Sequence, residues 1–321
     1  MRVLVTGATS MIGRTVINRL VERGDEVTAL QRRPSGIEGI TEIQGSITDI
    51  EVVHRAVEGQ EGVIHVAAKV DIVGDFDDFV EVNVQGTTNL TTAARGAGVK
   101  RFVYVSTPSV AHAGASIVGG GPATADPDRT SGHYATTKAM AERLSLSSST
   151  EEMPIVAIRP HLVIGPGDTQ LVGRILERAE QGRLPLVGTG LALVDATWVD
   201  NAAGALVAAL DKSPGLGGRA FVVSNGEPRT VHELLARITK AAGVEWSPRL
   251  VPSKLAIAGG RLVEKIWDTT GRQDEPPMTG FAAEQFSTAH WFDQTETRNA
   301  LDWEPSVSLA DGFEILAEHY Q

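Results

Sequence analysis

The stretch that decides the fold opens the chain: Arg2-Val3-Leu4-Val5-Thr6-Gly7-Ala8-Thr9-Ser10-Met11-Ile12-Gly13. Its first half is a short aliphatic, β-branched run, which predicts a buried strand. Apolar residues at helical spacing follow the glycine turn, namely Val16, Ile17, Leu20 and Val21. A tight turn between a first strand and a first helix directs backbone N–H groups at an anion such as a pyrophosphate. The stretch therefore predicts a dinucleotide-binding unit, with a bare structural turn as the alternative.

Short β-branched runs alternate with helical patterns further along the chain. Strands are predicted at Val3–Val5, Val27–Leu30, Val63–Ala68, Arg101–Val105, Ile155–Ile158 and Ala220–Val223. Most of these runs are apolar throughout, as expected for a parallel sheet that is covered on both faces. The alternation predicts an α/β fold built on a doubly wound, Rossmann-type parallel sheet.

The pattern changes after residue 165, where turn-rich segments begin. We expect residues 1–165 to form the dinucleotide-binding domain. Residues 166–321 are expected to form mainly a smaller substrate-binding lobe over the carboxyl edge of the sheet. Strands near 190–228, including 193–199 and 220–224, are expected to return to the large domain.

Composition excludes several classes of protein. The 321 residues carry a net charge of -11, with a sequence pI near 5.2, which disfavours a nucleic-acid partner. Cysteine is absent, which excludes disulfides, thiolate zinc sites and iron–sulfur clusters and fits a reducing compartment. The eight histidines show no metal-ligand spacing, so no metal site is expected. No apolar run reaches the roughly 18 residues of a membrane span and no signal peptide is predicted, so we expect a cytoplasmic protein.

The end of the second predicted strand bears on the choice of dinucleotide. An acidic residue there would hold the 2′-hydroxyl of NAD. Gln31 stands at that position instead, and Arg32 and Arg33 follow it. Guanidinium groups bind phosphates through charge-assisted, bidentate hydrogen bonds, so we predict NADP(H). The alternative is that both arginines are ordinary exposed loop charges.

A pair of side chains suited to proton transfer stands at Tyr134 and Lys138, on one face of a predicted helix. A free phenol has a pKa of about 10, and a neighbouring cation favours its ionised form. The pair alone is also typical of a surface helix. Ser106 and Thr107 follow the strand Arg101–Val105, at the strand end where ligands bind in open α/β sheets. A hydroxyl there could hydrogen-bond a substrate carbonyl.

Thr6–Gly13 resembles the TGxxGxxG fingerprint of the extended short-chain dehydrogenase/reductases, with Ser10 in place of the middle glycine. His65–Ala68, Asn83–Thr87 and Arg159–Asp168 match further segments of that family, so the resemblance covers essentially the whole chain. It implies hydride transfer between NADP(H) and a ketone. In that reaction Tyr134 donates the proton and Lys138 holds the nicotinamide ribose. The family pattern selects Thr107 as the hydroxyl that binds the carbonyl, with Ser106 as the alternative.

The resemblance also implies a set of cofactor contacts. Besides Arg32, Arg33, Tyr134 and Lys138, these are Gly7, Thr9, Ser10, Met11, Ile12, Gly13, Ser46, Ile47, Ala67, Ala68, Lys69, Asn83, Ser106, Pro160, Leu162 and Val163. Ser46 stands where the family usually has an acidic residue near adenine. We expect Ser10 to weaken or shift phosphate binding without abolishing it.

Departures from the family pattern indicate a branch. Sugar dehydratases carry Asp-Glu after the catalytic hydroxyl, where this chain has Pro108-Ser109. Sugar epimerases usually read Arg-Tyr-Phe-Asn where this chain reads Arg159-Pro160-His161-Leu162. The Arg-Pro form resembles the 3β-hydroxysteroid dehydrogenase-like branch, which implies an apolar carbonyl substrate.

Several sequence segments together resemble the 2-alkyl-3-oxoalkanoate reductases of bacterial long-chain olefin biosynthesis. They are Ser106–Val110, Leu193–Thr197, Asp200–Ala203, Ser224–Pro228 and His290–Phe292. Each segment alone could have a purely structural role. We interpret Asp200 and Asn201 first as helix caps. The resemblance implies a hydrophobic 3-keto or 3-hydroxy acid as substrate. It leaves open a homodimer and a complex with a β-lactone synthetase and a β-lactone decarboxylase.

The sequence leaves three rival functions open: a 3β-hydroxysteroid or sugar-alcohol dehydrogenase, a dinucleotide-binding protein without catalysis, and an assembly subunit. Apolar residues at helical spacing follow in the lobe, at Leu255, Ile257, Leu262, Val263, Ile266 and Trp267. We interpret them as lobe core, with an acyl-chain groove or a partner surface as the alternative. Gly119–Gly121 and Pro122–Ser131 predict a flexible, substrate-covering loop. His133 is predicted as a substrate contact or loop filler, and His161 as packing.

Overall fold

A seven-stranded parallel sheet forms the centre of the protein, seen in a computed structural model that describes residues 1–71, 74–112, 114–270, 272, 276 and 278–321. Its strand order is β12-β7-β5-β4-β1-β2-β3. The strands are β1 (Arg2–Thr6), β2 (Glu26–Gln31), β3 (Thr41–Gln44), β4 (Gly62–His65), β5 (Arg101–Val105), β7 (Ile155–Pro160) and β12 (Ala220–Val223). The order reverses between β1 and β4, and ligands bind outside the carboxyl ends of the strands at such a switch point.

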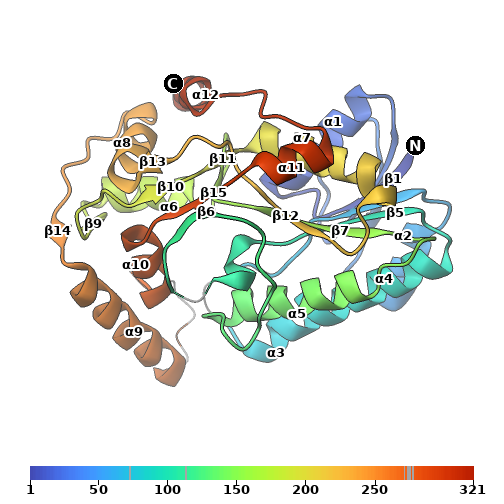
Figure 1. Cartoon of the computed structure of the whole chain (residues 1–321), viewed down its shortest axis with the longest axis horizontal. Coiled ribbons are helices and arrows are strands. Elements are labelled where there is room, and N and C mark those ends of the chain that lie inside the picture. The colour runs from blue at the N-terminus through green and yellow to red at the C-terminus, as the bar shows by residue number, and fades with distance from the viewer. Residues whose placement is uncertain (72–73, 113, 271, 273–275, 277) are drawn as a thin grey trace.

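Helices cover both faces of this sheet (Figure 1). One face packs against α1 (Met11–Glu22), α7 (Val199–Lys212) and α11 (Thr295–Leu301), and the other against α2 (Ile50–Val57), α4 (Gly86–Gly96) and α5 (His133–Ser147). Val3 and Val5 belong to the first core and Leu4 to the second. Side chains of a strand alternate between faces, so a strand covered on both sides is apolar at every position.

The lobe is built from smaller sheets and helices. A four-stranded sheet has the order β13-β10-β15-β6, and β11 pairs with β8 and β14 with β9. The strands of these three small sheets are β6 (Ile117–Gly120), β8 (Val163–Ile164), β9 (Leu186–Val187), β10 (Leu193–Val194), β11 (Thr197–Trp198), β13 (Arg229–Thr230), β14 (Leu250–Val251) and β15 (His290–Phe292). Its helices are α6 (Val172–Glu180), α8 (Val231–Ala241), α9 (Ser253–Thr270), α10 (Gly280–Ser287) and α12 (Leu309–Tyr320). Short elements elsewhere are α3 (Phe76–Phe79), the π-helix η1 (Val80–Gln85) and the 3-10 turns η2 (Pro108–Ala111) and η3 (Ser213–Gly215).

The predicted α/β fold is confirmed, and all six predicted strands lie in the large sheet. One strand, β3, went unpredicted because Thr41–Gln44 lies at the edge and is only partly buried, so it lacks an apolar run. The fourth strand ends at His65 and not at Ala68, because the Ala67 N–H leaves the ladder and donates to Thr6 Oγ1. Within the described part of the chain, no helix is long and apolar enough to cross a membrane.

One prediction about the lobe was wrong, and one about the segment before Tyr134 holds in part. Segment 193–199 does not return to the large sheet, because Val194 pairs with His290 and Thr197 with Val163. Only β12 returns, as predicted. The segment before Tyr134 is a loop from Gly121 to Ser131, as predicted, but Gly119 and Gly120 belong to β6, which pairs with β15.

Candidate active site

The predicted site residues gather at the carboxyl ends of the parallel strands. The turn after β1 and the start of α1 carry Gly7, Thr9, Ser10, Met11, Ile12 and Gly13. Arg32 and Arg33 follow β2, Ser46 and Ile47 follow β3, and Ala67, Ala68 and Lys69 follow β4. Ser106 and Thr107 follow β5, and Pro160, Leu162 and Val163 lie at the end of β7. Tyr134 and Lys138 lie on α5, and Asn83 lies in η1. One edge of the sheet therefore holds them all.

The turn between β1 and α1 can close this tightly only because two positions lack a Cβ. Gly7 has φ +78°, and a Cβ there would lie 2.9 Å from the Ala67 nitrogen. A Cβ on Gly13 would collide with the Gly7 carbonyl. Ser10 is the N-cap of α1, and its hydroxyl accepts from the Gly13 N–H (3.0 Å) and donates to the Gly7 carbonyl (2.8 Å). The hydroxyl is thus used within the turn. The first-turn N–H groups have no acceptor inside a helix and suit a phosphate.

The loop after β2 carries the predicted phosphate-binding arginines. Arg32 and Arg33 are both exposed, whereas Gln31 is buried and donates to Glu42 Oε1 (3.0 Å). Arg14 donates to the Ser35 carbonyl (2.7 Å) and so ties this loop to α1. Two exposed guanidiniums therefore lie on an anchored loop. Past β3, the Ser46 hydroxyl bonds with that of Thr48 (2.8 Å).

A buried chain of hydrogen bonds fixes the ends of β1 and β4. The Thr87 hydroxyl donates to the Asn83 carbonyl (2.6 Å), so it can only accept from His65 Nε2 (3.0 Å). His65 Nδ1 then accepts from the Thr6 hydroxyl (2.8 Å). Burial lowers the pKa of His65 to about 3, so this histidine is neutral. These hydrogen bonds hold the small residues after β4 beside Gly7.

Asn83 has a positioning part in this structure. Its Oδ1 accepts from the Lys69 N–H (2.7 Å), and its Nδ2 donates to the Lys69 carbonyl (3.1 Å) and to the Thr137 hydroxyl (3.1 Å). The side chain is buried. It therefore clamps the loop after β4 to α5.

The Tyr134–Lys138 pair occupies the start of α5. Lys138 is buried; its Nζ donates to the Val105 carbonyl (2.6 Å) and lies 4.1 Å from the centroid of the Tyr104 ring. Burial lowers the pKa of Lys138 to about 7, and the nearby Glu142 carboxylate opposes that shift. Burial raises the pKa of the half-buried Tyr134 to about 12. The expected lowering of the phenol pKa is therefore wrong for this structure, because desolvation dominates and the ammonium is bound to the end of β5.

Both candidate hydroxyls lie directly beyond the carbonyl that Lys138 binds. Thr107 is half-buried and caps η2, accepting from the Ser109 N–H and donating to the Ser109 hydroxyl, each at 3.3 Å. Ser106 is buried, and its Oγ has no hydrogen-bond partner among the residues described. The choice between them stays a prediction.

Sequence reasoning missed a buried ion pair behind the proton-transfer helix. Arg159 donates to both carboxylate oxygens of Glu142, at 2.8 and 2.5 Å, and to the Ala123 carbonyl at 2.7 Å. Glu142 stands one helical turn after Lys138, and both partners of the pair are buried. The pair joins α5, β7 and the segment that precedes Tyr134. Its signal in the sequence was an arginine in an otherwise apolar strand.

Three histidines meet between the large sheet and the lobe, and we call His112, His161 and His290 the histidine cluster. His161 Nδ1 donates to the Asp195 carbonyl (2.8 Å), and the Nε2 atoms of His112 and His290 are 3.3 Å apart. Burial lowers the pKa of His161 to about 4 and that of His290 to about 3. The packing predicted for His161 is thus seen. His133 instead packs its ring against Phe76 and Phe79.

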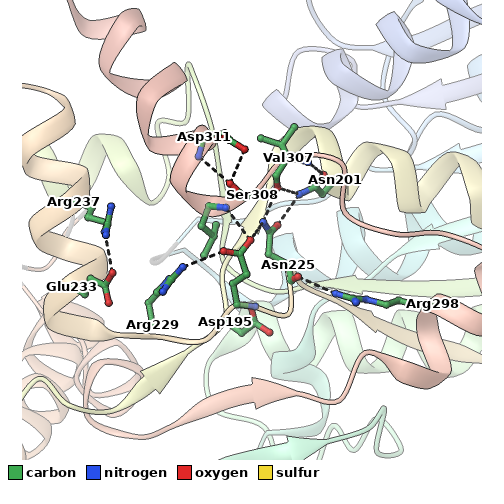
Figure 2. Close-up of polar contacts among 12 residues, drawn as sticks. Asp195, Asn201, Asn225, Arg229, Glu233, Arg237, Arg298, Val307, Ser308 and Asp311 are labelled. Atoms are coloured by element: carbon green, nitrogen blue, oxygen red, sulfur yellow. Dashed lines mark hydrogen bonds and ion pairs between the residues drawn. The ribbon is translucent and has the colours of Figure 1, made fainter.

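A polar network holds the lobe against α7 (Figure 2). Asn225 Oδ1 accepts from the Trp198 N–H and from Asn201 Nδ2, both at 2.9 Å. Asn201 Oδ1 accepts from the Val307 N–H (3.0 Å). Asn201 therefore clamps the chain before α12, and the expectation that it caps a helix is wrong because it lies buried inside α7.

Asp195 fixes the turn after β12 from the same network (Figure 2). Its carboxylate accepts from the Ser224 hydroxyl (2.7 Å) and the Glu227 N–H (3.1 Å). Burial raises its pKa to about 6. Within the described ranges, no group of three His, Cys, Asp or Glu residues is placed to hold a metal ion.

Residues 3–224 match the NAD dependent epimerase/dehydratase family. The chain is 39% identical over 324 residues to the 2-alkyl-3-oxoalkanoate reductase of Stenotrophomonas maltophilia (strain K279a), covering 98% of each chain. It is 37% identical over 326 residues to the protein of the same name from Shewanella oneidensis, covering 97% of this chain and 84% of the relative. A 3 beta-hydroxysteroid dehydrogenase/Delta 5-->4-isomerase of Mycobacterium tuberculosis is 32% identical over 342 residues, covering 99% and 90%.

Solved structures share the fold. The UDP-glucose 4-epimerase of Thermotoga maritima superposes with a TM-score of 0.74 at 22% identity, covering 100% of this chain and 98% of that one. MoeE5 in complex with UDP-glucose and NAD gives 0.76 at 22% identity, covering 99% and 98%. The resemblance seen in the sequence is confirmed, and the chain belongs to the NAD dependent epimerase/dehydratase family, as an extended short-chain oxidoreductase.

Proposed function

We propose that this protein is an NADP(H)-dependent reductase that converts the 3-keto group of a 2-alkyl-3-oxoalkanoic acid into the 3-hydroxy acid in long-chain olefin biosynthesis. The observation that carries the proposal is the identity of 39% and 37%, along nearly the whole chain, to two proteins named for that reaction. Dinucleotide binding is assigned to residues 1–165 together with β12, and substrate binding mainly to 166–321.

The residues present fit a dinucleotide. The turn after β1 is the tight glycine turn that brings the N-terminus of α1 to the end of the strand, and a Cβ at Gly7 or Gly13 would collide with its backbone. The bound dinucleotide would supply hydride to the carbonyl carbon of the substrate. The N–H groups of Met11 and Ile12 in the first turn of α1 would hold its phosphates, while Gly7 and Gly13, whose N–H groups donate to Leu30 and Ser10, shape the turn.

This chain's own residues would handle the proton and the developing charge. The Tyr134 hydroxyl donates its proton to the carbonyl oxygen, and a phenol held at a raised pKa is in the protonated form that this step requires. Lys138 would hold the nicotinamide ribose, and in its protonated form it would place positive charge beside the site. Thr107 hydrogen-bonds the same oxygen, so the alkoxide meets donors that are already in position. Hydride and proton together turn the ketone into the alcohol.

Turnover tests the substrate. Purified protein is incubated with NADP+ and a 2-alkyl-3-hydroxyalkanoic acid, the chemically stable side of the reaction, and NADPH formation is followed. We expect turnover with long alkyl chains and none with a 3β-hydroxysteroid or a nucleotide sugar. Turnover with the steroid alone would assign the activity named for the Mycobacterium tuberculosis relative.

The choice of NADP(H) rests on Arg32 and Arg33 and on Gln31 in place of an acidic residue. A charge-assisted hydrogen bond contributes about 1.5–3 kcal/mol, so Arg32→Ala/Arg33→Ala should weaken NADPH binding at least about tenfold. NADH binding should change little, because NADH lacks the 2′-phosphate. The control is Arg55→Ala on α2, which should leave both affinities unchanged. An unaltered ratio of the two affinities in the double variant would refute the preference.

A further inference from the structure

Helix α9 shows a stripe of large apolar side chains on the outside of the lobe. Leu255 is 67% exposed, Leu262 60% and Ile266 42%. The spacing of seven and then four residues places all three on one helix face, and we call them the apolar stripe. The interpretation of this helix as lobe core is wrong for these three residues. It holds in part for Ile257, which is partly buried and packs against the cluster of Val187, Ala256 and Ala283.

A row of cations runs beside the apolar stripe. Lys254, Arg261 and Lys265 are exposed and repeat the spacing of the stripe one residue earlier, so they flank it on one side. Arg261 also pairs with Glu284 on α10 (2.6 Å). Glu264 is turned toward α10 as well, since its Oε1 accepts from the Gly280 N–H (2.9 Å).

The charge of this region runs against that of the chain. Residues 249–272 contain five Arg or Lys and two Asp or Glu, whereas the whole chain has a net charge of -11. Leu250, 69% exposed, extends the apolar surface just before the helix. Figure 1 shows α9 at the outer end of the lobe, away from the seven-stranded sheet. The side chains of the apolar stripe are therefore open to solvent at the outer end of the lobe.

We propose that α9 docks the lobe onto an anionic lipid surface. An amphipathic helix at such a surface buries its apolar face by about 5–10 Å in the acyl boundary, while lysine and arginine reach the phosphates. Leucine and isoleucine beside lysine match that chemistry. The core of a protein–protein interface is instead rich in aromatic residues and poor in lysine. The basic row also selects anionic over zwitterionic lipids, since each Lys or Arg near the surface contributes about 1 kcal/mol.

The inference goes beyond the proposed reduction and does not depend on it. If the substrate carries long alkyl chains, docking would place the lobe where such molecules partition. Lipid binding needs no turnover, so failure of one proposal leaves the other standing.

Co-sedimentation with vesicles tests the docking. The full-length protein is mixed with vesicles of phosphatidylcholine alone or of equal parts phosphatidylcholine and phosphatidylglycerol. We expect pelleting with the mixed vesicles only. The variant Leu255→Gln/Leu262→Gln/Ile266→Gln should bind at least about tenfold more weakly, and Lys254→Glu/Lys265→Glu should also lose binding.

A matched control separates the stripe from apolar exposure in general. Ile50 on α2 and Ile315 on α12 are 44% and 40% exposed, so Ile50→Gln/Ile315→Gln removes similar groups elsewhere and should bind as the wild type does. Circular dichroism checks that each variant is folded. Absence of wild-type pelleting, or equal pelleting of the stripe variant, overturns the proposal. So does a change of oligomeric state in the stripe variant without lipid binding, which would assign the stripe to a contact between copies.

Discussion

Single side chains at the carboxyl edge of the sheet have environments that their sequence neighbours do not reveal. Tyr134 and Lys138 are separated by one helical turn, yet Lys138 binds the Val105 carbonyl. Burial moves the pKa of the phenol up to about 12 and that of the ammonium down to about 7. The protonation state of Lys138 therefore depends on the charged groups that are buried beside it, such as Glu142.

Replacing Tyr134 with phenylalanine removes the proposed proton donor and leaves the ring. We expect turnover to fall by roughly 10²–10⁴-fold, the usual contribution of a positioned acid. NADPH affinity should stay within about twofold, because the loss belongs to the chemical step. Steady-state kinetics and fluorescence titration with NADPH check this. A fully active variant would exclude the assigned role.

Glu142 is expected to act on the reaction through Lys138, as a positioning residue. The Glu142 carboxylate raises the pKa of Lys138 against the effect of burial. Glu142→Gln should therefore lower the Lys138 pKa, so that activity is lost at a lower pH as pH rises. The pH profile of kcat/KM measures this shift.

The same substitution leaves Arg159 buried without its counter-charge, which costs about 3–5 kcal/mol. Glu142→Gln/Arg159→Met removes both charges and should recover part of that stability. It should not restore the pH profile. Recovery of the wild-type profile would mean that Glu142 serves the fold alone.

At the scale of elements, α1 shows how a turn overrides helix propensity. Alanine is ordinarily better than glycine inside a helix by about 1 kcal/mol. At Gly13 the added Cβ would meet the Gly7 carbonyl, which cannot move without opening the turn. Whether replacing Gly13 by alanine raises or lowers the free energy of unfolding is therefore decided by the neighbouring turn.

Gly13→Ala should lower both the free energy of unfolding and NADPH affinity. Gly259→Ala is the matched control, because a Cβ there meets nothing within 4 Å inside α9. It should raise stability slightly, as propensity predicts. Urea denaturation measures the change in the free energy of unfolding for both variants, and changes of the same sign would contradict this expectation.

For the whole molecule, buried neutral histidines make stability depend on pH. His65, His161 and His290 have folded-state pKa values of about 3, 4 and 3, against about 6.5 in an unfolded chain. The unfolded chain therefore binds more protons over that range, and stability falls as pH drops below about 6.5. Asp195, whose pKa is raised to about 6, works in the opposite direction but is one group against three.

Thermal unfolding at about pH 7.5 and about pH 5 should therefore show a clear loss of stability, at up to about 1.4 kcal/mol per pH unit for each proton. His161→Gln should reduce the pH dependence. The control His54→Gln, at an exposed position on α2, should leave it unchanged. Identical slopes for wild type and His161→Gln would contradict this account.

The sequence alone was sufficient for the parallel sheet and for the glycine turn after β1. Strands buried on both faces must be apolar at every position, and the turn needs glycine where a Cβ would collide, so both leave local patterns. The edge strand β3 left none, because partial burial imposes no strict alternation, and among the short strands described in the lobe those within 193–199 were the ones predicted.

Tertiary structure decided what depends on contacts between distant segments. The ion pair of Glu142 with Arg159, the histidine cluster, and the clamp of Asn201 on Val307 each join residues from separate elements. Exposure of the apolar stripe was decided in the same way, because α10 covers only one side of α9. Local sequence sets which conformations are open to a segment, whereas burial and desolvation are set by what packs against it.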